Sequence, residues 1–193
     1  KRNREVINKN SPNLVWLTSH PSLYSAGISA KDSDLLEPKI PVFKTNRGGK
    51  YTYHGPGIRI IYVMFDLKEL FMPNRPDISK FINLLENWII NSLSKVGIKG
   101  EIRKDRVGIW VKTNNSEEKI AAIGIKLKKW VTYHGIAVNI NPNLQYFNDI
   151  IPCGIKEFGV TSLEKLGITT TQEEFDKILQ EEFTKIFEEF TKK

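Results

Sequence analysis

The order of strand-like and helix-like segments along the chain is the feature that most constrains its fold. Residues 77–96 carry apolar side chains at helical spacing, and a second amphipathic segment begins where Thr171 and Glu174 form a capping box. Between turn residues we expect strands at 14–18, 40–44, 58–67, 107–112, 119–127 and 130–140, and a short helical stretch at 144–150. Strands with interspersed helices predict a single mixed α/β (α+β) domain over residues 1–193, a β-sheet flanked by helices.

Composition restricts the class of function. The net charge is +7 and the pI about 9.4, but the basic residues are scattered along the chain. Such a charge fits either compositional drift or a surface for an acidic partner. A nucleic-acid-binding module would need clustered Lys and Arg with exposed aromatic residues on one face, so we expect no nucleic-acid partner.

Targeting signals and disulfides are not predicted. No apolar run approaches the length of a membrane span, and the basic start of the chain is not followed by a long apolar segment. We therefore expect a cytoplasmic protein with no membrane partner. A single cysteine excludes an internal disulfide and suits a reducing cytosol. Because the chain does not begin with Met, we expect residues upstream of Lys1.

Cys153, between Pro152 and Gly154, is a candidate nucleophile. A lone cysteine is more often a small buried hydrophobic residue, but here proline stiffens the backbone and glycine allows a substrate to approach closely. An ordinary thiol with a pKa of about 8.5 is only a few per cent thiolate at neutral pH. A catalytic cysteine therefore needs a neighbouring base or cation, and composition alone does not choose among the histidines and lysines.

A glycine-rich segment, RGGKYTYHGPG at 47–57, is expected to form a loop between two strands. It can bring backbone donors close to a ligand carbonyl or phosphate, or simply connect the strands. Its spacing matches neither a Walker loop nor a dinucleotide-binding fingerprint. The tetrapeptide Thr-Tyr-His-Gly occurs at 52–55 and again at 132–135, which suggests two walls of one site.

Three segments together resemble the lipoyl(octanoyl) transferase family: 47–57, KIAAIGIKLKKWVTYHGIAVNINPNL at 119–144, and IIPCGIKEFGVTSL at 150–163. The resemblance implies the fold shared by the catalytic domains of biotin–protein and lipoate–protein ligases. It implies transfer of an octanoyl group from octanoyl-acyl carrier protein to the target lysine of lipoyl domains, in 2-oxoacid dehydrogenases and the glycine cleavage H protein. It further implies a monomer that needs no metal and no cofactor.

The resemblance also assigns site residues. Cys153 would be the acyl-thioester nucleophile, and Lys119 would lower its pKa and act as general acid and base. The implied substrate-binding residues are Arg47, Gly48, Gly49, Lys50, Tyr51, Thr52, Tyr53, His54, Ala122, Ile123, Gly124, Gly135, Ile136 and Ala137.

Two residues depart from the family pattern: Lys50 stands where Asp or Gln is usual, and Ile58 where Gln commonly follows HGPG. Both departures concern local loop contacts. The rival interpretation is an ATP-dependent lipoate–protein or biotin–protein ligase on the same fold. Such a ligase activates a free acid as an adenylate and needs no cysteine.

Overall fold

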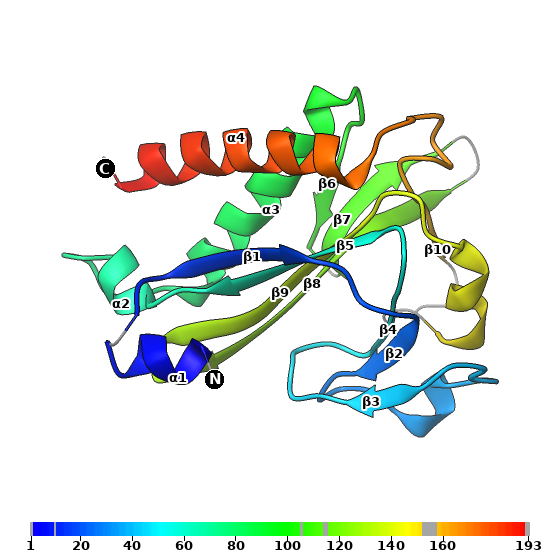
Figure 1. The fold of residues 1–193 in the computed structure, drawn as a ribbon, viewed down its shortest axis with the longest axis horizontal. Helices are drawn as coiled ribbons and strands as arrows, with labels where there is room; N and C mark the ends of the chain where they lie inside the picture. The colour runs from blue at the N-terminus through cyan, green and yellow to red at the C-terminus, as the bar shows by residue number, and fades with distance from the viewer. Residues whose placement is uncertain (1, 10, 105, 114–115, 152–157, 192–193) are drawn as a thin grey trace.

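The computed structural model describes residues 2–9, 11–104, 106–113, 116–151 and 158–191 of the chain. A large sheet carries two long helices on one face, and a small sheet lies below one end of it (Figure 1). The strands are β1 (Leu14–Thr18), β2 (Leu23–Ala26), β3 (Val42–Lys44), β4 (Tyr51–His54), β5 (Ile58–Met64), β6 (Glu101–Arg103), β7 (Arg106–Lys112), β8 (Glu117–Lys128), β9 (Val131–Asn139) and β10 (Gly159–Val160). The α-helices are α1 (Arg2–Ile7), α2 (Leu67–Leu70), α3 (Ile78–Lys95) and α4 (Gln172–Thr191), and the 3₁₀ helices are η1 (Asp32–Asp34) and η2 (Leu144–Asp149).

The large sheet is antiparallel along its main path, in the order β1-β5-β9-β8-β7-β6. Its centre is the long hairpin of β8 and β9, in which Gly124 lies opposite Gly135 and Ile123 opposite Ile136. Strand β10 runs parallel to the start of β8, with Val160 opposite Lys119. The small sheet has the order β3-β2-β4, with β3 parallel and β4 antiparallel to β2.

Helices α3 and α4 cover one face of the large sheet and enclose the main hydrophobic core (Figure 1). Asp77 caps α3 by accepting hydrogen bonds from the backbone N–H groups of Ser79 and Lys80, at 2.9 and 3.0 Å. The indole of Trp88 donates to the carbonyl oxygen of Leu179 at 2.8 Å and so joins the two helices. Burial of this apolar face is the main stabilising contribution on the helix side.

The mixed α+β class and both long helices are confirmed. The glycine-rich segment differs from the prediction, because residues 51–54 form strand β4 and are not loop. Strand β2 was also not predicted. The two strands form because alternate residues, among them Tyr24 and Tyr53, are buried on one face of their antiparallel pair. Short helices α1 and α2 were missed too; α2 starts at Asp66, whose carboxylate accepts from the N–H groups of Lys68 and Glu69.

Within the described ranges, no helix is both long enough and apolar enough to cross a membrane.

Candidate functional site

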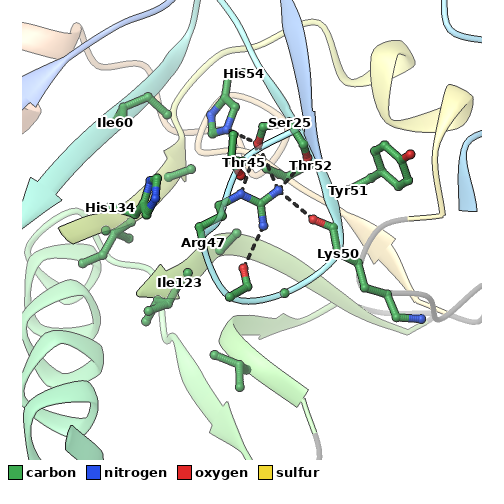
Figure 2. A pocket seen from close by; sticks show the side chains of 18 of the residues that line it. Ser25, Thr45, Arg47, Lys50, Tyr51, Thr52, His54, Ile60, Ile123 and His134 are labelled. Carbon is green, nitrogen blue, oxygen red and sulfur yellow. Dashed lines mark hydrogen bonds between the residues drawn. The ribbon is translucent and has the colours of Figure 1, made fainter. Parts of the chain in front are cut away.

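A cavity of about 430 Å³ lies where residues of the small sheet face β8 and β9 of the large sheet. The segment between β3 and β4 closes over it, and side chains from β2, β4, β5, β8 and β9 converge on it (Figure 2). A second hydrophobic core, built from both sheets and η2, supports this region. The cavity is therefore bounded by segments that are distant in sequence.

Arg47 holds the segment before β4 in place through its guanidinium. Its Nη2 donates to the backbone oxygens of Ser25 and Lys50, both at 2.6 Å, and its Nη1 donates to the carbonyl of Gly48 at 2.9 Å. Its Nε and Nη2 also donate to the hydroxyl of Ser25, at 3.1 and 2.9 Å (Figure 2). Arg47 thus binds backbone carbonyls of β2 and of the segment before β4 with one guanidinium, and the carbonyl of Lys50 also accepts from the N–H of Gly27 at 3.1 Å.

Glycines allow this segment to pack against its neighbours without side chains in the way. A Cβ added to Gly27 would lie 2.2 Å from the carbonyl oxygen of Gly49, which itself has a φ of +85°. A Cβ on Gly124 would lie 3.1 Å from the carbonyl oxygen of Gly48, whose N–H donates to Ile125 of β8 at 3.3 Å. The Arg-Gly-Gly sequence is therefore needed for the close approach of this segment to β8.

His54 is fixed in one tautomer by Ser25. The Ser25 hydroxyl accepts two hydrogen bonds from Arg47, so its own hydrogen points to His54 Nε2, 2.9 Å away. His54 is therefore neutral, with its hydrogen on Nδ1. Burial and, to a smaller extent, the positive charge of Arg47 together lower the pKa of His54 to about 3.

All three histidines of the chain line the cavity. His20 Nε2 lies 2.7 Å from the hydroxyl of Tyr62, and His134 Nε2 lies 2.9 Å from Asn46 Oδ1. Burial lowers the pKa of both, and nearby Arg47 adds to this effect at His134. The two Thr-Tyr-His-Gly segments do face one cavity, because their histidines stand on β4 and β9.

Lys119 points from β8 into the same cavity, with only 5% of its surface exposed. Its Nζ donates to the carbonyl oxygen of Val107 at 2.8 Å and lies 4.6 Å from the centre of the Trp110 ring. A cation is thus held at the cavity wall by a neutral acceptor and an aromatic face.

The structure brings together Lys119 and nearly all of the implied substrate-binding residues around one cavity. Of the implied substrate-binding residues, those that line the cavity are Arg47, Gly48, Gly49, Lys50, Tyr51, Thr52, His54, Ala122, Ile123, Gly124, Gly135, Ile136 and Ala137. Tyr53 is not among them: it is buried in the second core and stacks on Tyr146. Cys153 falls in 152–157, outside the described residues.

The two departures from the family pattern have local structural roles. Lys50 Nζ lies 3.5 Å from a carboxylate oxygen of Asp34, and Ile58 is fully buried in the second core. Ile58 therefore contributes to packing beneath the cavity.

Sequence reasoning missed several cavity residues. Ser25, Thr45, Tyr62 and Phe147 line it without belonging to a recognisable motif. No local sequence signal marks Ser25, because its place in the cavity depends on the pairing of β2 with β4, the strand that carries His54.

One wall of the cavity is apolar. Ile60, Ile123, Ile136, Ala137 and Phe147 supply hydrocarbon surface next to the polar histidine and arginine groups. Among the described residues, no group of three or more His, Cys, Asp or Glu side chains is placed to hold a metal ion. The cavity thus combines an apolar slot with a buried lysine.

Comparison with known proteins identifies the family. Residues 3–184 match the model of the lipoyl protein ligase A/B catalytic domain. The chain is 57% identical over 163 residues to the octanoyltransferase of Wolbachia pipientis subsp. Culex pipiens, covering 84% of this chain and 78% of that protein. The chain belongs to the octanoyltransferase family. A second octanoyltransferase, from Parvibaculum lavamentivorans, is 53% identical over 161 residues, covering 81% and 70% of the two chains.

The fold of this octanoyltransferase family member is shared with ligases. The bipartite lipoate protein ligase of Thermoplasma acidophilum superposes with a TM-score of 0.74 over 98% of this chain and 84% of that chain, at 13% identity. At that identity the likeness shows the fold alone. The ligase interpretation is therefore supported only by a distant fold relative, whereas the family assignment rests on high sequence identity.

Proposed function

We propose that this chain transfers an octanoyl group from octanoyl-acyl carrier protein to the target lysine of lipoyl domains, through a thioester on Cys153. Membership of the octanoyltransferase family is the observation that carries the proposal. The structure supports it with a cavity that has an apolar wall and a buried lysine, Lys119, at its edge.

In the first half-reaction the Cys153 thiolate attacks the carbonyl carbon of the donor thioester. The carbon–sulfur bond to the acyl carrier breaks, and the departing thiolate takes a proton from Lys119. The products are an octanoyl thioester on Cys153 and the free thiol of the carrier. No redox step and no nucleotide are needed.

In the second half-reaction the acceptor lysine gives a proton to Lys119 and its amine attacks the thioester carbon. The Cys153 thiolate leaves, the new amide nitrogen releases its remaining extra proton to solvent, and the octanoyl group ends in an amide bond. Strand β10 supports this pairing of roles, since Val160, which follows Cys153 closely in sequence, lies opposite Lys119 on β8.

The apolar wall is the proposed slot for the acyl tail. At about 0.8 kcal/mol per buried CH₂, an eight-carbon chain contributes on the order of 5 kcal/mol of binding free energy. The neutral state of His54, whose pKa is lowered to about 3, avoids placing a further cation beside that chain near neutral pH. Ile123 and Ile136, opposite each other on β8 and β9, supply part of the slot.

The partners follow from the reaction. The positive net charge of +7 suits acyl carrier protein and lipoyl domains, which are generally acidic. The lipoyl domains of 2-oxoacid dehydrogenases and the glycine cleavage H protein are the proposed acceptors. We propose that the enzyme acts in the cytoplasm as a monomer and needs no cofactor.

Mass spectrometry after mixing with octanoyl-acyl carrier protein tests the proposal. We expect a mass gain of one octanoyl group on the intact chain, localised to Cys153 and removed when a lipoyl domain is added. Cys153→Ala is the matched control and should remain unmodified. Full transfer activity in Cys153→Ala, or activity that depends on ATP and free octanoate, would instead establish the ligase reaction.

A further inference from the structure

We propose that Trp110 and Gly108, which lie on either side of a register shift between β7 and β8, are positioning elements that hold the Lys119 ammonium in place for proton transfer. The inference rests on the proposed function, in which Lys119 is the general acid and base. None of the sequence motifs includes Trp110 or Gly108, and both lie on β7, beside the strand that carries Lys119.

The first observation is the register of the two strands. Trp110 lies directly opposite Lys119, so their side chains emerge on the same face of the sheet. This places the Lys119 Nζ 4.6 Å from the centre of the indole ring. Tryptophan has the most attractive aromatic face for a cation, and the attraction grows when the pair is removed from water. Both side chains are almost fully buried, at 2% and 5% exposed.

The second observation is the register shift. The β7–β8 register shifts between Ile109 and Trp110, and the preceding Gly108 has a φ of +120°. A Cβ at Gly108 would lie 2.6 Å from the carbonyl oxygen of Ala121 and 3.2 Å from Lys119 Cε. Bulges redirect groups near active sites, and here the carbonyl of Val107 accepts from Lys119 Nζ at 2.8 Å.

The third observation is that Trp110 is itself held. Its indole N–H donates to the carbonyl of Arg106 at 3.1 Å, and the Arg106 guanidinium lies 4.5 Å from the indole ring and 3.8 Å from the ring of Phe158. Arg106 Nη2 also bonds to Glu117 at 2.7 Å. Hydrogen bonds from Arg103 and then Arg106 lower the pKa of Glu117 to about 2, so this carboxylate stays ionised.

These contacts restrict a flexible side chain. A lysine side chain has large rotamer entropy to lose, and proton transfer requires the nitrogen within hydrogen-bond reach of its partner. The carbonyl of Val107 and the aromatic face of Trp110 both restrict the position of Nζ. Trp110 and Gly108 thus act through Lys119 and do not touch substrate.

The matched variants Trp110→Phe and Trp110→Leu test the role of the aromatic face. Both lose the indole N–H and keep an apolar side chain, but only phenylalanine keeps a π face. Relative to wild type we expect the single-turnover transfer rate to fall about threefold in Trp110→Phe and about twentyfold in Trp110→Leu. The KM for octanoyl-acyl carrier protein should stay within about twofold, since no substrate contact is removed.

A measurement on the wild-type chain keeps the inference testable even if Trp110→Leu does not fold. The methylene protons of Lys119 Cε should show an upfield ring-current shift in NMR spectra, with the signal assigned by its loss in Lys119→Arg. The shift should disappear in Trp110→Leu and persist in Trp110→Phe. A Lys119 signal at ordinary lysine positions in the wild type would overturn the inference.

Kinetic measurements on variants of Lys119 and Trp110 distinguish a failure of this inference from a failure of the proposed function. If Lys119→Ala transfers octanoyl groups at the wild-type rate, the catalytic role of Lys119 is wrong, and the positioning role falls with it. If Lys119 is essential but Trp110→Phe and Trp110→Leu lose rate equally, or only in proportion to their stability, the positioning role alone is overturned.

Discussion

The two faces of the large sheet are built in different ways. On the helix face, α3 and α4 pack apolar side chains into one continuous core, with the Trp88–Leu179 hydrogen bond between the helices. On the cavity face, Arg47, several glycines and three neutral histidines surround an open space. The helix face gains stability from the burial of apolar side chains. The cavity face depends on hydrogen bonds from Arg47 to backbone carbonyl groups.

This difference shows how a fold shared with ligases can carry a different reaction. The helix face does not enter the cavity, so its side chains can change without altering the chemistry. The cavity face has little freedom, because a Cβ at Gly135 would lie 1.8 Å from the carbonyl oxygen of Ile61, and one at Gly27 would overlap Gly49. Variants on the two faces should therefore separate stability from activity.

The largest expected effect is on the helix face, in Trp88→Ala. Removing this fully buried indole leaves a cavity in the main core and should lower the free energy of unfolding by about 3–5 kcal/mol. Urea denaturation measures the loss. Transfer activity per folded molecule, assayed well below the unfolding temperature, should remain close to wild type. Trp88→Phe is the control and should lose less; a large drop in its activity would contradict the separation of the two faces.

On the cavity face, Arg47→Lys should lower both the stability of the protein and its transfer activity. Lysine keeps the charge but lacks the planar fork that reaches the carbonyls of Ser25, Gly48 and Lys50. Losing most of these hydrogen bonds from a charged donor should cost about 3 kcal/mol of stability. Since the segment over the cavity loses its anchor, kcat/KM should fall more than stability alone explains. Wild-type stability in Arg47→Lys would show that this network is dispensable.

The helix face was the easier half to predict from sequence. Helical spacing identified α3 and α4, and Thr171 with Glu174 identified the start of α4, because these are local signals. The cavity face was predicted only where a family motif marked it. Ser25 and Trp110 were missed because their roles depend on strand pairing with distant residues, which leaves no pattern in nearby sequence.

Tyr53 is an error of the opposite kind, because it was predicted as a substrate-binding residue and does not line the cavity. It lies inside a motif whose neighbours line the cavity, yet it packs in the second core. Side chains alternate along a strand, so a motif that forms β4 cannot present every residue to one site. The prediction treated this segment as loop and therefore had no reason to divide its residues between two faces.

The pH dependence of stability sharpens the comparison further. The folded pKa of His54 is lowered to about 3 from 6.5, so between these values the unfolded chain binds a proton that the folded chain does not. Stability is therefore fully present above pH 6.5 and decreases as the pH falls. From pH 8 to pH 5 this group alone should remove about 2 kcal/mol of unfolding free energy.

His54→Gln tests this contribution, because glutamine does not titrate and its amide oxygen can accept from Ser25. The difference in unfolding free energy between wild type and His54→Gln should change by about 2 kcal/mol between pH 8 and pH 5. His20 and His134, whose pKa values are also lowered, remain in both chains and cancel. Parallel pH profiles for the two chains would contradict the buried, neutral state of His54.

The smallest expected effect returns to the helix face, in Thr171→Ala. The Thr171 hydroxyl accepts from the N–H of Glu174 at 3.1 Å, and the Glu174 carboxylate accepts from the N–H of Thr171 at 2.8 Å. Those bonds lower the pKa of Glu174, which ties the cap to an ionised carboxylate. Losing the hydroxyl should cost about 1 kcal/mol in urea denaturation, while Thr171→Ser should cost little. Octanoyl transfer should be unchanged in both, since α4 stabilises the sheet from the side opposite the cavity; a selective loss of transfer in Thr171→Ala would mean that the two faces are coupled.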